Sequence, residues 1–259
     1  MKIWYQSGAA LGIDPALNEY TAALKTYLGR IVRSDTEVVV HGIETFIPLT
    51  DKSRFSVLLL ESQIVKAALR ADQEGYDVFC AGSTLDPAYY EIREVVDIPI
   101  CSLSEVSMYL ASLLGGKFAV LAFNKLMLTR LAELARRYGL QDKLVPSQPV
   151  DIAGTNLRQG FTEPRVLLDP AEAVAKEAAE KGAGMLIPST GIINMILGKH
   201  GITEIGGVPV LEGNGALVKV AELMVDLARI GIKRSKLAFP PITRDELADT
   251  KKTFSKVSL

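Results

Sequence analysis

Hydrophobic and polar positions follow two alternating patterns along the chain. Short, nearly continuous apolar runs are typical of strands buried on both faces of a sheet. They occur at residues 3–6, 36–41, 77–81, 97–100, 117–123, 184–187 and 207–210, with a shorter candidate at 144–145. Between these runs, apolar residues recur at helical spacing at residues 18–33, 57–71, 124–138, 172–180 and 217–230. Further helices are predicted to begin at Pro87 and near Ser104, whereas residues 151–165 show no period and are predicted to form a loop or lid. Strands that alternate with helices in this way predict an α/β fold with parallel sheets.

One unit of this pattern occurs twice. A buried run precedes Ser83-Thr84, another precedes Ser189-Thr190, and each pair is followed by a helix and a second strand. The copies are offset by 106 residues at the Ser-Thr pair and by 110 residues at the prolines Pro99 and Pro209, so one four-residue insertion reconciles them. The repeat predicts two pseudo-symmetric parallel-sheet half-domains with an active-site cleft between the two loops, because parallel sheets bind ligands beyond the carboxyl ends of their strands.

We assign the half-domains from this repeat. The first is expected to contain residues 1–101 together with 212–232, and the second residues 102–211. Residues 233–259 form a separate C-terminal tail, either an arm that packs on a neighbouring subunit or a partly disordered end. We expect a homo-oligomer.

Composition narrows the classes of partner. The chain has 259 residues, 48% of them hydrophobic, and a net charge of −1, which argues against a nucleic-acid or anionic-membrane partner. No apolar stretch approaches the ~20 residues of a membrane helix, and the start of the chain does not resemble a signal segment. Cys80 and Cys101, with His41 and His200, lack the spacing of a metal site. We therefore expect a cytoplasmic protein without a disulfide framework and without a metal.

Three segments resemble the Asp/Glu/hydantoin racemase superfamily. They are residues 75–87 with 93–99, residues 117–121 with 136–140, and residues 182–210 with the helix at 216–223. The resemblance implies two half-domains around a cleft, in which one cysteine from each half faces the α-carbon of the substrate. One thiolate removes a proton and the opposite thiol supplies another, without a metal or an organic cofactor.

This sequence departs from the family at the reactive positions. The first family cysteine aligns with Ser83, the second aligns with Ser189 or Thr190, and an asparagine after the first strand aligns with Ser7. An alcohol is a much weaker acid than a thiol and needs a neighbouring base to react. We therefore expect the hydroxyl groups to bind a carboxylate, carbonyl or oxyanion, and two-base racemisation by thiols is unsupported.

The predicted site has a catalytic set and a substrate-binding set. The catalytic candidates are Ser83, Ser189, Thr190 and His41, the last because it ends a strand and is the one imidazole in the first half. The substrate-binding candidates follow other strands or flank the two loops, and they are Ser7, Thr84, Gly191, Asn124 and Cys101. Asp86 and Glu105 are read as helix-start residues, and Cys80 as a core residue.

Three functions remain open at this point. The first is a cofactor-independent, isomerase-like enzyme acting on a small carboxylate, amide or cyclic imide, with His41 or Cys101 moving the proton. The second is a hydrolase or decarboxylase that uses Ser83 as nucleophile or oxyanion donor in the same cleft. The third is a non-catalytic protein that binds a small anion. A base close to Ser83 would discriminate among them.

Overall fold

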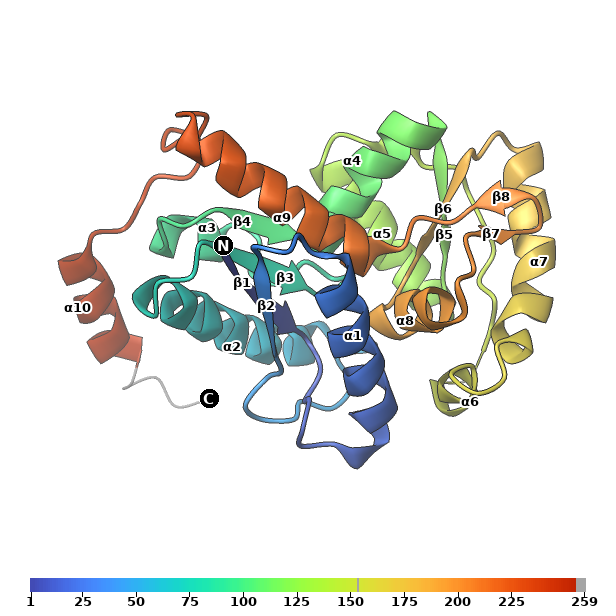
Figure 1. Ribbon diagram of the computed structural model, residues 1–259, viewed down its shortest axis with the longest axis horizontal. Helices are drawn as coiled ribbons and strands as arrows, with labels where there is room; N and C mark the ends of the chain where they lie inside the picture. The colour runs from blue at the N-terminus through green and yellow to red at the C-terminus, as the bar shows by residue number, and fades with distance from the viewer. Residues whose placement is uncertain (153, 255–259) are drawn as a thin grey trace.

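Two parallel sheets form the centre of the molecule (Figure 1). The computed structural model describes residues 1–152 and 154–254. The first sheet has the strand order β2-β1-β3-β4, and its strands are β1 (Lys2–Ser7), β2 (Glu37–His41), β3 (Val78–Gly82) and β4 (Ile100–Ser102). All of its neighbouring strands run parallel.

The second sheet repeats this order. Its central strands β5 (Phe118–Leu121) and β6 (Met185–Pro188) are parallel, and single parallel bridges join Leu144 to Phe118 and Val210 to Leu186. The order Leu144, β5, β6, Val210 therefore corresponds to β2-β1-β3-β4. A small antiparallel pair, β7 (Glu204–Ile205) and β8 (Val208–Pro209), precedes the last bridge. The predicted α/β fold with parallel sheets is confirmed, while the predicted limits of the half-domains stay a prediction.

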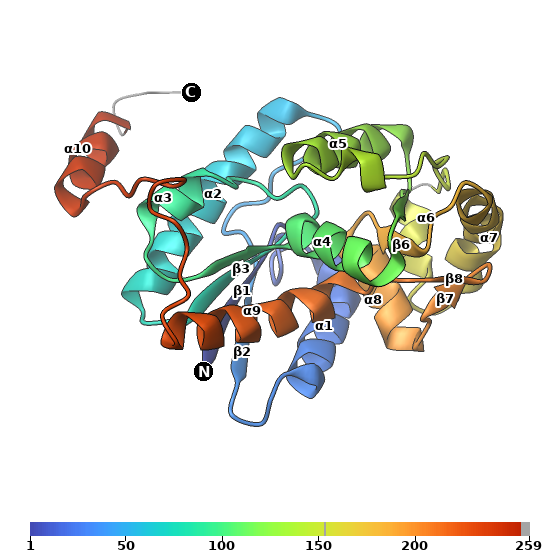
Figure 2. The ribbon, with the colours of Figure 1, turned by 90° about the horizontal axis from the view of Figure 1, so that it is seen from above.

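Helices cover both faces of the sheets (Figures 1 and 2). The helices are α1 (Asn18–Ile31), α2 (Arg54–Gln73), α3 (Glu91–Val95), α4 (Leu103–Gly115), α5 (Lys125–Arg137), α6 (Gly154–Gln159), α7 (Arg165–Glu180), α8 (Gly191–His200), α9 (Gly213–Arg229) and α10 (Arg244–Phe254), with 3₁₀ turns at Pro15–Leu17 and Gln141–Lys143. One face of the first sheet is covered by α2, and the other by α9, which also contacts α1 and α4. The second sheet packs against α4 and α7.

Alternation along β1 explains how one strand serves two cores. Ile3 and Tyr5 point into a core that continues into the second sheet through Ala119 and Leu186, whereas Trp4 points into a separate core beneath α2. Successive side chains of a strand face opposite sides, so a strand with helices on both sides reads as continuously apolar. One core therefore joins the two halves.

Two local predictions are wrong. The helix expected from Pro87 begins only at α3, because Asp86 and Ala88 adopt positive φ angles of 42° and 55° and the chain turns before it can become helical. The stretch 151–165 contains α6, so it is not simply a loop.

The C-terminal tail packs first on its own chain. Arg234 Nη2 donates to the carbonyl of Val96 at 2.6 Å, and the Ile242 amide donates to the carbonyl of Glu94 at 3.0 Å. Beyond this stretch α10 stands apart, at the end of the molecule opposite α7 (Figure 1). Within residues 1–152 and 154–254, no helix is both long enough and apolar enough to cross a bilayer.

Candidate functional site

The two Ser-Thr loops meet in the folded protein. Ser83 and Thr84 directly follow β3, and Ser189 and Thr190 directly follow β6. Thr84 Oγ1 donates a hydrogen bond of 2.8 Å to the backbone carbonyl of Ser189. Residues about a hundred positions apart in the sequence are therefore held together where the central strands of the two sheets end.

The hydroxyl groups of the two loops have different surroundings. Thr190 caps α8, because its Oγ1 accepts a hydrogen bond from the Ile193 amide at 3.1 Å. The side chain of Ser189 is 0% exposed, and its Oγ finds no hydrogen-bond partner in the described part of the chain. Ser83 is only half-buried, so it is the loop serine accessible to a small molecule. The structure thus assigns a capping role to Thr190, leaves Ser83 as the accessible hydroxyl, and buries the Ser189 hydroxyl without a partner among the described residues.

Ser7, Gly8 and Gly191 adjoin these loops. Ser7 ends β1 and accepts a hydrogen bond from the Ala9 amide at 3.2 Å. A Cβ at Gly8 would lie 3.1 Å from Ser83 Oγ, so Ser83 lies directly against the turn after β1. The predicted residues Ser7, Ser83, Thr84, Ser189, Thr190 and Gly191 therefore gather at one end of the sheets.

Tyr20 is a site residue that sequence reasoning missed. A Cβ at Gly191 would lie 2.6 Å from its hydroxyl oxygen, and the neighbouring Ser7 side chain opposes the rise in its pKa that burial causes. Burial raises the pKa of Tyr20 to about 12, so the phenol stays protonated at neutral pH and can donate a hydrogen bond. In the sequence Tyr20 fits the apolar stripe of α1, and nothing in that pattern distinguishes its hydroxyl group.

A carboxyl group with a nearly neutral pKa lies beside Tyr27, about two turns of α1 after Tyr20. Glu212 caps α9 by accepting hydrogen bonds from the Asn214 and Gly215 amides at 3.0 and 2.6 Å. Burial raises its pKa from 4.5 to about 7, against the opposing effect of these two amides. The charge of Glu212 in turn raises the pKa of Tyr20. In the sequence, Glu212 is only an acidic residue before Gly213, and because acidic residues are common at helix starts, nothing there indicated its raised pKa.

The stability of the protein should report the ionisation of Glu212. The pKa in the folded protein is higher than the ordinary value of 4.5, so the stabilisation is complete below that pH and is lost as the pH rises through about 7. We expect wild type to lose stability relative to Glu212→Gln between these two pH values, because the amide does not titrate. Urea unfolding of both proteins across this range measures the difference. If the difference in unfolding free energy between the two proteins did not change with pH, Glu212 would ionise normally in the folded protein.

His41 lies on the other face of the first sheet. Its ring stacks on that of Trp4, with the centroids 3.6 Å apart, in the layer that α2 covers. Burial lowers the pKa of His41, and the positive charge of Arg70 lowers it further. In the sheet, β1 lies between β2, which carries His41, and β3, which leads into Ser83, and the His41 ring packs on Trp4 of β1. The prediction that His41 is a cleft base is corrected: it is a packed ring on a strand face.

The cysteines are core residues. Cys80 and Cys101 are opposite each other on β3 and β4, and both are buried as free thiols. Burial raises the pKa of Cys101 to about 12, so it remains a neutral thiol at physiological pH. The predicted role of Cys101 in substrate binding is therefore wrong, whereas Cys80 is buried as expected.

Asn124 also has a structural partner. Its Oδ1 accepts a hydrogen bond of 2.9 Å from the Met127 amide, which makes it the N-cap of α5. The sequence placed Asn124 correctly after a strand, and the structure shows that it caps α5, while its predicted role in substrate binding stays a prediction. Asn, Ser and Thr are favoured at both kinds of position, so the sequence pattern does not separate them.

Asp86 links the first Ser-Thr loop to the second half. Its carboxylate accepts hydrogen bonds from the amides of Ser104 and Glu105 at 2.9 and 2.8 Å, and from the Tyr138 hydroxyl at 2.6 Å. Burial raises the pKa of Asp86 to about 6. Asp86 thus binds the amides at the start of α4, and it does not cap a helix that directly follows it in the sequence. Glu105 forms an ion pair with Arg93, at 2.6 Å, instead of facing a ligand.

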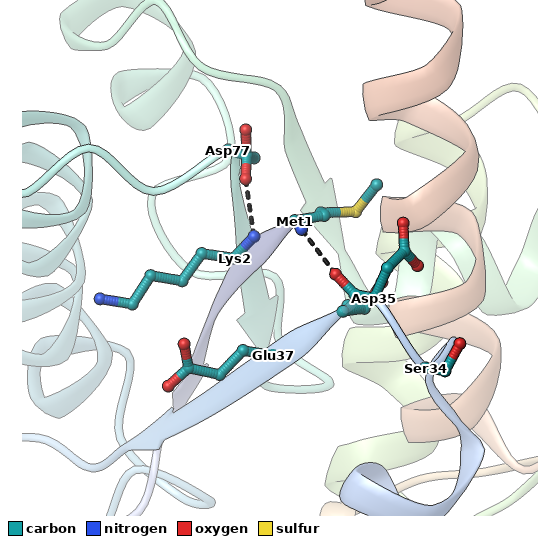
Figure 3. Close-up of a pocket in the computed structure, with 7 residues that line it drawn as sticks. Met1, Lys2, Ser34, Asp35, Glu37 and Asp77 are labelled. Carbon is teal, nitrogen blue, oxygen red and sulfur yellow. Dashed lines mark hydrogen bonds between the residues drawn. The ribbon is translucent and has the colours of Figure 1, made fainter.

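A hollow of about 440 Å³ lies at the opposite end of the first sheet (Figure 3). It is lined by Met1, Lys2, Asp35, Glu37 and Asp77, and the Lys2 amide donates to Asp77 at 2.6 Å. This end carries the amino termini of the strands, where parallel sheets do not place their ligands. Over residues 1–152 and 154–254, no three side chains of the kinds that bind metals come together.

The fold and the site define the class of protein: it has two similar parallel-sheet halves, and their hydroxyl-bearing loops meet where the strands end. A family model described as Asp/Glu/Hydantoin racemase matches residues 12–221, and the chain belongs to this family. It is 29% identical over 212 residues to hydantoin racemase of Pseudomonas sp. (strain NS671), across 79% of each chain. This membership indicates an enzyme of the isomerase type.

Solved structures share the fold. Allantoin racemase from Klebsiella pneumoniae has a TM-score of 0.76 and 19% identity, with 94% of this chain and 95% of that chain covered. Allantoin racemase from Pseudomonas fluorescens has a TM-score of 0.77 and 19% identity, with 94% and 97% covered. The two parallel-sheet halves are therefore those of known racemases.

Proposed function

We propose that the protein is an isomerase-type enzyme that acts on a small carboxylate, amide or cyclic imide without a metal or an organic cofactor. The observation that carries this proposal is the contact between Thr84 and the Ser189 carbonyl at the ends of β3 and β6. This contact places Ser83 and Ser189 in neighbouring loops. We expect one small ligand to contact the accessible Ser83 hydroxyl directly and to reach the unpaired Ser189 hydroxyl by displacing the groups that cover it. Family membership supports the isomerase class, and the hydroxyl groups support a ligand with oxyanion character.

The proposed chemistry differs from a two-thiol exchange. Ser83 and Ser189 hold the carboxylate, or the enolate-like oxygen that develops when the α-proton leaves. Tyr20 keeps its proton because of its raised pKa and can donate a hydrogen bond next to Gly191. Glu212, whose charge raises the pKa of Tyr20, has a pKa of about 7 and can hold or release a proton near neutral pH.

The test follows deuterium uptake from heavy water at the α-carbon of aspartate, glutamate, allantoin and a 5-substituted hydantoin by NMR. We expect the protein to exchange at least one of these protons. Replacement of either Ser83 or Ser189 by Ala should slow this exchange by about 10²-fold or more, the cost of losing one oxyanion donor. Ser62→Ala is the matched control, because that hydroxyl is exposed on α2 and donates a hydrogen bond to the Leu59 carbonyl within the same helix.

Alkylation separates this proposal from a thiol mechanism. Both thiols are buried, so iodoacetamide should leave the exchange rate of the folded protein unchanged. Rapid inactivation that substrate prevents would contradict the proposal, as would the absence of exchange with every compound in folded protein. The hydrolase alternative lacks support, since the imidazole that Ser83 would need is stacked on Trp4.

A further inference from the structure

A second pocket lies between α2 and α5. Its volume is about 240 Å³, and its walls are formed by Arg54, Val57, Glu61, Leu85, Arg130, Glu133, Leu134 and Arg137. Figure 2 shows α2 and α5 on the same side of the molecule. Leu85, which directly follows Thr84, is contributed by the loop after β3. None of the six residues gathered at the Ser-Thr site lines this pocket.

The charges of the pocket are unbalanced. Three arginines face two glutamates, which leaves one net positive charge. Arg54 neutralises Glu133 directly, since Arg54 Nη2 lies 2.8 and 2.9 Å from the two carboxylate oxygens. Arg137 forms no ion pair in the described part of the chain and lies near the rings of Tyr89 and Tyr90. Arg130 and Arg137 are thus the cations that remain available.

Arg130 is the unusual member of this group. It is only 5% exposed, and its Nη1 donates to the carbonyl of Thr50 at 2.6 Å. Its Nε is buried without a hydrogen-bond partner, and no carboxylate among the described residues lies within 4.0 Å of its guanidinium nitrogens. Burial lowers the pKa of Arg130, and the charges of Asp51 and Glu133 offset this effect only in part, so a group that pairs with its free N–H would stabilise the guanidinium. In this protein Arg130 lines a pocket, so a bound ligand could supply that partner.

We infer that this pocket binds a small organic anion with one carboxylate group. One carboxylate balances the single excess charge, and a guanidinium matches a carboxylate in both charge and geometry. Val57, Leu85 and Leu134 add apolar surface to the lining, and Leu134 lies between Arg130 and Arg137 on one face of α5. The pocket shares Leu85 with the loop after β3, but it is lined by other residues than those gathered at the Ser-Thr site, and the inference does not depend on the reaction proposed there.

The test titrates the whole protein with isobutyrate, a branched monocarboxylate, and follows the NMR signals of Val57, Leu85 and Leu134. We expect saturable shifts at millimolar ligand. Replacement of either Arg130 or Arg137 by Gln should weaken binding by about tenfold or more, because each removes a charged hydrogen-bond donor. Arg137→Gln keeps the test decisive if Arg130→Gln does not fold, since Arg137 is exposed. Arg136→Gln is the matched control: it is exposed on the same helix, does not line the pocket and should leave binding unchanged.

Two further ligands test the chemistry. Isobutyramide has the same shape without the charge and should not bind, and inorganic phosphate should bind more weakly than isobutyrate because two glutamates would repel its second charge. Equal binding of the amide, or tighter binding of phosphate, would overturn the assignment of a monocarboxylate. Isobutyrate shifts at Thr190 and Gly191 but not at Leu85 would also overturn it, because they would place the ligand at the Ser-Thr site.

Discussion

Replacing Gly82 with alanine should lower the free energy of unfolding by about 3 kcal/mol or more, since a well-packed core resists added atoms. A Cβ at this position would lie 2.3 Å from Tyr5 Cζ and 2.5 Å from the Tyr5 hydroxyl oxygen. Tyr5 cannot move aside easily, because it is 0% exposed and donates a hydrogen bond of 2.6 Å to Asn214 Oδ1. The expected loss is measured by urea unfolding, followed by the fluorescence of the buried Trp4.

Two further variants isolate the cause of this effect. Gly29 lies in α1 with open space around it, so Gly29→Ala should stabilise the protein by up to about 1 kcal/mol through helix propensity. Tyr5→Leu removes the ring that Gly82→Ala would strike, so the double variant should be less destabilised than the sum of the two single variants. If the stability losses of the two single variants simply added in the double variant, or if Gly82→Ala were as stable as wild type, the contact with Tyr5 would not be what disfavours a larger residue at Gly82.

Removing the carboxylate of Asp86 should cost about 3–4 kcal/mol, because buried donors that lose their acceptor pay the full desolvation penalty. Asp86→Ala leaves the amides of Ser104 and Glu105 at the start of α4 without an acceptor, and it also leaves the Tyr138 hydroxyl unpaired. Because Asp86 lies just after Thr84, the loss should extend to the contact between the two Ser-Thr loops. Urea unfolding measures the first effect, and the NMR signals of Thr84 and Ser189 report the second.

Asn124→Ala is the comparison for Asp86. Asn124 caps α5 through a single hydrogen bond at a half-buried position, so its replacement should cost only about 1 kcal/mol. Equal losses for the two variants would mean that Asp86 is an ordinary cap and does not link the loop to the second half.

The sequence by itself determined the α/β class, the order of most elements and the internal repeat. These features depend on local periodicity, which each segment carries in its own residues: continuous apolar runs such as 77–81 and amphipathic stretches such as 124–138. The pairing of Ser83-Thr84 with Ser189-Thr190 was also predictable, because the repeat places both pairs after corresponding strands. Burial of Cys80 followed from its position inside a strand.

Only the tertiary structure decided which side chains share a site. His41 and Cys101 were well placed along the chain, yet His41 stacks on Trp4 of the neighbouring strand and Cys101 is buried in the core. The contact of Tyr20 with Gly191 and the burial of Glu212 beside Tyr27 were invisible in the sequence, because they depend on elements that are distant along the chain. The pocket beside Arg130 likewise depends on α2 and α5 lying together. Local pattern fixes the direction of a side chain within its own element, whereas its partners depend on how the elements pack.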